Sequence, residues 1–116
     1  MLGFGIPSGA YSVQLREILP SLAVELEELL NHHPEADLAD QVSQLAVVDR
    51  CRCGDEFCSS FYTQPKPEGN YRRDHRCVEL DAAEGMLLVY VVEGKIVHVE
   101  ILNRGGVRRN LLAALP

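Results

Sequence analysis

Four cysteines are the residues of this 116-residue chain with the clearest capacity for chemistry, and three of them crowd one short segment. Cys51, Cys53 and Cys58 stand in the pattern C-x-C-G-x3-C, and Gly54 permits the sharp turn that brings the third cysteine back toward the first two. Structural zinc sites accept four cysteines, or three cysteines and a histidine. We therefore expect a tetrahedral Zn²⁺ site formed by Cys51, Cys53, Cys58 and Cys77, with His75 as the alternative fourth ligand.

The spacing of these cysteines leaves two alternatives open. Zinc sites more often carry paired C-x-x-C units at two separated points, so the same residues also fit ordinary reduced thiols packed on a sheet. A thiol-dependent enzyme would use them as well. However, Cys51-x-Cys53 lacks the C-x-x-C spacing at a helix N-terminus that lowers a thiol pKa. Metal content and the rate of thiol alkylation distinguish the three cases.

Hydrophobic periodicity predicts helices in the first part of the chain, over residues 11–45. An apolar stripe recurs every three or four residues up to residue 31, which is typical of an amphipathic helix. Pro20 should kink that helix or split it into segments of about 12–19 and 20–31, because proline lacks the amide proton that a helix interior needs. A second, short helix is expected after Pro34.

The pattern becomes β-like over residues 46–102, and a short helical segment is expected at 107–115. Strands are expected at 46–51, 57–63 and 76–80, with a proline-containing loop over 64–74. The sequence thus predicts one α+β domain over residues 1–116, in which N-terminal helices pack on an antiparallel β-meander of about four to five strands.

The strongest local signal is a β-hairpin over residues 86–102 that turns at Glu93-Gly94. A two-residue turn fixes the register and predicts one core face that covers the helices, with the pairs Val92–Lys95, Tyr90–Val97, Leu88–Val99 and Met86–Ile101. The opposite face then carries Val91–Ile96, Val89–His98 and Leu87–Glu100. This outer face is more apolar than a monomer usually leaves bare, so residues 1–10, the C-terminal segment or a second subunit should cover it. Of these we expect a protein partner or a second copy in a homodimer.

Composition excludes several classes of function. The net charge is −6, and residues 1–49 carry one arginine against eight acids, so binding to nucleic acid is disfavoured. No apolar run approaches the ~20 residues that span a membrane, and the first residues lack the basic start of a signal peptide. We expect a cytoplasmic protein with reduced thiols. The catalytic motifs G-x-S-x-G and H-E-x-x-H are absent.

Three stretches of the chain carry a resemblance: Val-Val-Asp-Arg-Cys-Arg-Cys-Gly at 47–54, Ser-Phe-Tyr-Thr at 60–63 and the second hairpin strand at 93–102. Over residues 44–102 the chain resembles a group of small uncharacterised bacterial proteins with a C-x-C-G segment followed by a C-terminal hairpin. The resemblance implies an α+β fold in a bacterial cytoplasm and brings no activity, cofactor or site residue. We therefore expect a non-catalytic binding or regulatory protein, with a zinc-stabilised interaction module and a small thiol-dependent enzyme as the alternatives.

Overall fold

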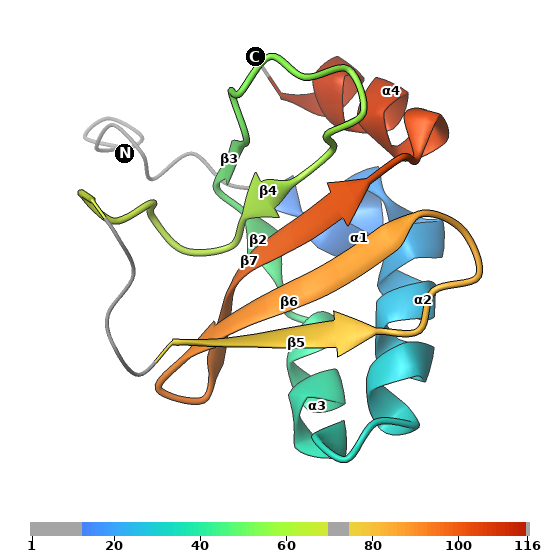
Figure 1. The fold of residues 1–116 in the computed structure, drawn as a ribbon, viewed down its shortest axis with the longest axis vertical. Coiled ribbons are helices and arrows are strands. Elements are labelled where there is room, and N and C mark those ends of the chain that lie inside the picture. The colour runs from blue at the N-terminus through green and yellow to red at the C-terminus, as the bar shows by residue number, and fades with distance from the viewer. Residues whose placement is uncertain (1–12, 70–74, 116) are drawn as a thin grey trace, which may run out of the picture.

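A computed structural model describes residues 13–69 and 75–115 of the chain and confirms the α+β fold (Figure 1). Its centre is an antiparallel sheet of five strands in the order β3-β4-β7-β6-β5. These strands are β3 (Asp49–Arg50), β4 (Phe61–Tyr62), β5 (Arg76–Leu80), β6 (Met86–Val92) and β7 (Lys95–Leu102). A second sheet pairs β1 (Val13–Gln14) with β2 (Ala46–Val47).

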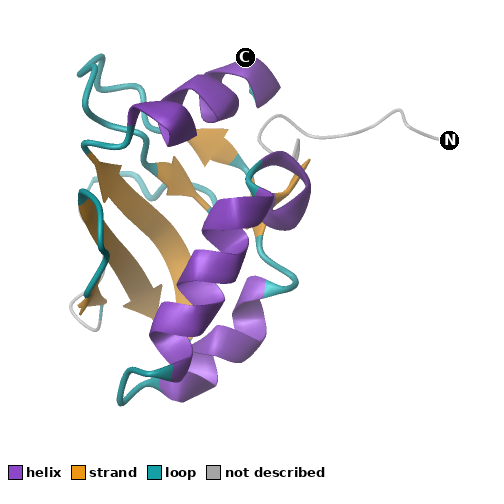
Figure 2. Ribbon diagram, turned by 90° about the vertical axis from the view of Figure 1, so that its right-hand side faces the viewer, coloured by secondary structure: helices purple, strands orange, loops and turns teal. Residues whose placement is uncertain are grey.

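The helices cover one face of the five-stranded sheet and leave the other face open (Figure 2). They are α1 (Leu15–Ile18), α2 (Pro20–Asn31), a 3₁₀ turn at Ala36–Leu38, α3 (Ala39–Val42) and α4 (Gly105–Ala114). The expected break at Pro20 is present, because Leu19 leaves helical geometry and the proline opens α2. Helical structure begins at Leu15 rather than at residue 11, and Val13–Gln14 form a strand instead. Residue 11 lies outside the described part.

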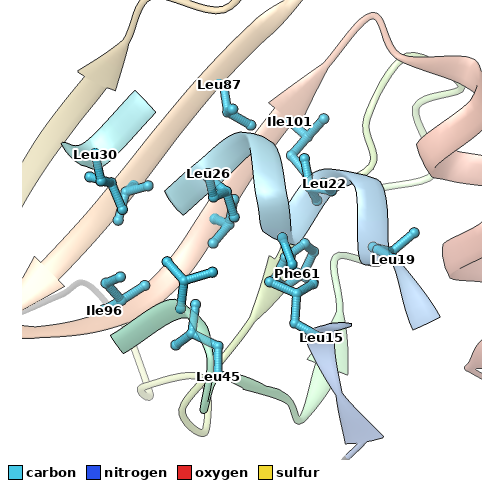
Figure 3. Close-up of a cluster of buried hydrophobic side chains, with 14 of the residues drawn as sticks. Leu15, Leu19, Leu22, Leu26, Leu30, Leu45, Phe61, Leu87, Ile96 and Ile101 are labelled. Carbon is cyan, nitrogen blue, oxygen red and sulfur yellow. The ribbon is translucent and has the colours of Figure 1, made fainter. Parts of the chain in front are cut away.

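The core lies between α1, α2 and α3 and the inner face of the sheet (Figure 3). Leucines spaced three or four residues apart turn toward the strands from α1 and α2, and Phe61 and Ile101 meet them from β4 and β7. Such side chains contribute ~1.5–3 kcal/mol each when fully buried, so this face fixes how the sheet sits against the helices. Within the described ranges, no helix is long and apolar enough to cross a membrane.

The hairpin turns at Glu93-Gly94 as expected, and both residues have positive φ, +52° and +77°, as a type I′ turn requires. The expected pairs Val92–Lys95 and Val91–Ile96 are present. Beyond them a β-bulge shifts the register, so that Tyr90 pairs with His98 and Val89 with Val99. The expected pairs Tyr90–Val97, Leu88–Val99, Met86–Ile101, Val89–His98 and Leu87–Glu100 are therefore wrong.

The expected face is also wrong for β6 and for Ile96, whereas Val99 and Ile101 belong to the core as expected. Leu87, Val89, Val91 and Ile96 were expected on the outer face, but they are at most 2% exposed and belong to the core. Ile96 and Val99 are three residues apart, so in a regular strand their side chains would point to opposite faces. The bulge at Val97 lets both point to the core. The outer face carries every second residue of β6, among them Tyr90. From β7 it carries His98 and Glu100. Binding of a partner to this face stays a prediction, and it now concerns different residues.

Candidate metal centre

The cysteine segment is tied into the sheet at both of its ends. Cys51 continues β3, and its amide donates to the carbonyl oxygen of Ser60 at 2.8 Å. Cys58 forms an isolated bridge with Leu102, just beyond the regular part of β4. The amide of Asn103 donates to the carbonyl oxygen of Phe57 at 2.8 Å. The loop between Cys51 and Cys58 therefore starts and ends on backbone hydrogen bonds to neighbouring strands.

Helix α4 braces the same loop from the end of the sheet. Nη1 of Arg108 donates to the carbonyl oxygens of Asp55 and Cys58, at 2.8 and 3.0 Å. The amide of Cys58 also donates to Asp55, at 3.2 Å, which closes a turn inside the loop. No local pattern connects Arg108 with a loop fifty residues earlier, because this contact depends on where α4 packs.

Three of the five expected ligands come together. The sulfur atoms of Cys51, Cys53 and Cys58 all lie within 4.8 Å of one another, close enough to bind one metal ion. Gly54, which follows the second cysteine, has φ of +84° in the turn that folds the loop back. Cys53 is exposed and the other two thiols are half-buried, so the group opens to solvent.

The structure does not bring Cys77 or His75 to this group. Both lie on or beside β5, at the edge of the sheet opposite β3. Four strand steps of about 4.8 Å separate those edges, a distance of about 19 Å. Cys77 pairs across the sheet with Tyr90, and the ring of His75 stacks on Tyr90 at 6.2 Å between centroids. Within residues 13–69 and 75–115, no other histidine nitrogen or carboxylate oxygen completes the three-cysteine group.

The three thiols line a surface pocket of about 390 Å³ on the open face of the sheet. Its other walls include Asp55, Phe57, Ser60, Tyr62, His98 and Glu100. Ser60 and Tyr62 alternate with Phe61 along β4, so they point away from the core in which Phe61 is buried. The same period of two places Cys58 on their side. This alternation is the sequence signal that could have linked Cys58 to Ser60 and Tyr62.

The protein environment separates the acidities of Cys51 and Cys58. Burial, together with the neighbouring thiols, raises the pKa of Cys51 to about 11. Burial alone would also raise the pKa of Cys58, but hydrogen bonds from Ser60 and the neighbouring thiols outweigh it and lower that pKa. Oγ of Ser60 lies 3.4 Å from the sulfur of Cys58. Cys58 therefore ionises more readily than Cys51.

His98, which the sequence predicts on the outer face of the hairpin, lies in the wall of this pocket. The residue is 8% exposed, and its ring lies between Tyr62 and Tyr90, at 4.4 and 5.2 Å between centroids. Its Nδ1 is buried and has no hydrogen-bond partner among the described residues. Burial, aided by the charge of Lys66, lowers the pKa of His98 to about 4, so the ring is neutral at pH 7.

The arrangement combines three adjacent thiols with a solvent-open pocket on a rigid sheet, which suits capture of a soft metal ion or thiol chemistry. Comparison of the chain with protein-family models, with curated proteins and with solved structures finds no match.

Proposed function

We propose that this domain is a non-catalytic binding protein that holds one Zn²⁺ ion through Cys51, Cys53 and Cys58. The observation that carries the proposal is the mutual approach of the three sulfur atoms, within 4.8 Å. Tetrahedral zinc with Zn–S bonds of about 2.3 Å places its sulfur ligands roughly 3.8 Å apart. Small rotations of the three side chains close that difference, and the backbone of the sheet stays where it is.

The donor set selects the kind of metal. Thiolate ligands favour Zn²⁺ and Cu⁺ over Mg²⁺ and Ca²⁺, which prefer oxygen. The thiols must lose their protons to bind the ion, and these protons pass to the solvent, so the affinity rises with pH. The hydrogen bonds of Cys51 to Ser60 and of Arg108 to Cys58 hold the ends of the loop in place. Because the ends of the loop are already fixed, metal binding costs less conformational entropy than it would in a free loop.

Zinc content of single-cysteine variants tests the proposal. Protein purified with a phosphine reductant should contain close to one zinc per chain by elemental mass spectrometry. Cys51→Ser, Cys53→Ser and Cys58→Ser should each lose most of that zinc. Cys77→Ser is the matched control, because the fourth cysteine lies on β5 outside the group, and it should retain the wild-type content.

Chelation gives a second readout in the same proteins. Zinc at a hundredfold excess over its dissociation constant stabilises the folded state by about 2.7 kcal/mol. Removal of zinc should therefore lower the unfolding midpoint of the wild type and of Cys77→Ser, and leave that of Cys58→Ser unchanged. Wild-type protein that binds no zinc under reducing conditions, or a Cys58→Ser protein that binds it as well as the wild type, would disprove the proposal.

The lowered pKa of Cys58 favours a second candidate, a small thiol-dependent enzyme with Cys58 as nucleophile. In metal-free protein this function requires that Cys58 reacts with iodoacetamide near neutral pH much faster than Cys77, whose pKa burial raises. Peptide mapping by mass spectrometry assigns each label. Equal, slow labelling of both cysteines would remove this candidate and leave the metal proposal intact.

A further inference from the structure

The three-cysteine group would leave a bound zinc ion one ligand short. Zinc in structural sites takes four ligands, whereas three protein ligands with an open position are typical of sites that bind something further. Within the described residues, neither a histidine nitrogen nor a carboxylate oxygen joins the three sulfur atoms. Cys77 and His75, the expected fourth ligands, are held at the opposite edge of the sheet.

The open position borders the pocket that the three cysteines line. The pocket has a volume of about 390 Å³, which lies within the ~300–1,000 Å³ typical of sites for small molecules. Phe57, half exposed, and Tyr62 both contribute to its wall. Aromatic faces of this kind pack well against a flat ring. The pocket therefore has room for a ligand that reaches the metal, and it offers aromatic surface to hold a planar one.

Charge decides the class of that ligand. A dication held by three thiolates carries one net negative charge, and two acidic residues, Asp55 and Glu100, line the same pocket. One cation, the ammonium of Lys66, lies 5.8 Å from the ring centroid of Tyr62 in the pocket wall, so the negative charges outnumber it. The guanidinium of Arg108 donates to backbone carbonyl oxygens of the loop and is not part of the pocket wall. An anionic fourth ligand would meet like charges at short range, whereas a neutral nitrogen donor would not. Imidazole nitrogen is a neutral ligand that zinc binds readily beside thiolates.

We propose that the metal ion held by Cys51, Cys53 and Cys58 takes its fourth ligand from outside this chain, and that this ligand is an imidazole nitrogen. The inference rests on the proposed zinc function, since it assigns a ligand to the same ion. A free imidazole compound and the histidine side chain of a partner peptide offer the same chemistry, and the experiment below separates these two sources.

Cobalt substitution makes the fourth ligand visible. Metal-free protein, kept reduced with a phosphine, is loaded with Co²⁺. The near-ultraviolet bands report the thiolates, and the visible bands report the whole ligand set. Added imidazole should change the visible bands saturably and leave the thiolate bands in place, while azide at equal concentration should have little effect. Cys77→Ser and His75→Ala should respond like the wild type, because both residues lie at the opposite edge of the sheet. His98→Phe removes the imidazole in the pocket wall and tests for a ligand from within the chain.

A tripeptide Gly-His-Gly, compared with Gly-Ala-Gly, identifies the source of the nitrogen. Saturation by the histidine peptide at lower concentration than by imidazole points to a partner's histidine, and the reverse order points to a small molecule. Visible bands that ignore imidazole, respond to azide instead, or change in His98→Phe before any addition would overturn the inference and leave zinc binding standing. Absence of thiolate bands altogether would remove the metal proposal itself, and the inference with it.

Discussion

The hydroxyl oxygen of Ser60 lies 3.4 Å from the sulfur of Cys58. The same oxygen accepts a hydrogen bond from the amide of Ile101, at 2.9 Å. Because the oxygen is already an acceptor for that amide, the hydroxyl proton is free to point at the sulfur and stabilise its thiolate form. One buried side chain thus connects the ionisation of Cys58 to the backbone of the central strand β7.

Ser60→Ala should therefore raise the pKa of Cys58 and destabilise the fold together. Loss of the hydroxyl leaves the buried amide of Ile101 without its partner, which costs about 1–3 kcal/mol. The rate of Cys58 alkylation against pH, mapped by mass spectrometry, measures the first effect, and urea unfolding measures the second. Ser59→Ala is the control, because Ser59 donates to the carbonyl of Arg104 at 3.3 Å. An unshifted alkylation profile in Ser60→Ala would contradict the assigned role.

Two adjacent leucines in β6 test which face of the hairpin is core. Leu87 is 1% exposed, whereas Leu88 is half-buried on the outer face. Leu87→Ala should cost about 2–5 kcal/mol of unfolding free energy, since it opens a cavity in the core. Leu88→Ala should cost about 1 kcal/mol, because partial burial yields only part of the ~1.5–3 kcal/mol of a full one. Urea unfolding compares the two, and the opposite order would restore the bulge-free register.

A lysine at position 89 illustrates the practical consequence of this register. On the face expected from the sequence, Val89→Lys would have separated a dimer into folded monomers. Val89 is 0% exposed in the structure, so a charge there should unfold the chain, and the substitution reports nothing about a partner. A partner on the outer face is better tested with Tyr90→Lys, which changes a residue that is half-buried on that side.

Alanine substitutions at Gly85 and Gly94 distinguish the destabilisation caused by a steric collision from that caused by backbone strain alone. Both have positive φ, +65° and +77°, so alanine at either site costs roughly 1–2 kcal/mol. At Gly85 the added methyl group would also collide with the carbonyl oxygen of Leu102 and lie 2.8 Å from Cγ of Arg104, whereas at Gly94 nothing lies within 4 Å. Thermal unfolding should show Gly85→Ala to be clearly the less stable protein. Equal losses of stability in the two variants would contradict the close contact between Gly85 and the carbonyl oxygen of Leu102.

Local patterns predicted much of this fold, because they act over a few residues. Strand β5 spans Arg76–Leu80 as expected, and the hairpin turns at Glu93-Gly94. Period-two alternation and turn chemistry are sufficient for both. The expected faces were wrong for β6 and for Ile96, because one inserted residue, Val97, shifts the alternation of β7. The chain is apolar on both sides of Val97, so the sequence pattern does not mark a bulge there.

The candidate site was predicted only in its local part, for the same reason. Cys51, Cys53 and Cys58 are neighbours in the chain, so their approach requires a single loop. The fourth ligand required knowledge of strand order, because β7 lies between β4 and β6 and places β5 at the far edge. Arg108 and His98 depend on packing across the whole domain. Those contacts follow from tertiary structure, which the spacing of ligands does not contain.

His98 should make the stability of the domain depend on pH between about 6.5 and 4. Its pKa falls from 6.5 to about 4 in the folded state, because burial disfavours the charged ring. Between those values the unfolded chain binds a proton that the folded chain does not, so the free energy of unfolding decreases as the pH falls. The loss reaches about 2–3 kcal/mol at pH 4, and above pH 7 the group contributes no pH dependence.

His98→Phe isolates this contribution, because phenylalanine keeps the aromatic contacts with Tyr62 and Tyr90 and removes the buried Nδ1 that has no partner among the described residues. At pH 7 the variant should be as stable as the wild type or somewhat more so, since an unpaired buried polar atom is lost.

Carboxylates titrate in both proteins, so the quantity to measure is the difference in unfolding free energy between them, in metal-free samples. That difference should grow by about 2–3 kcal/mol in favour of the variant from pH 7 to pH 4. A flat difference for His98→Phe would show that the ring of His98 takes up its proton in the folded state, and that the pocket beside the cysteines is wetter than its packing implies.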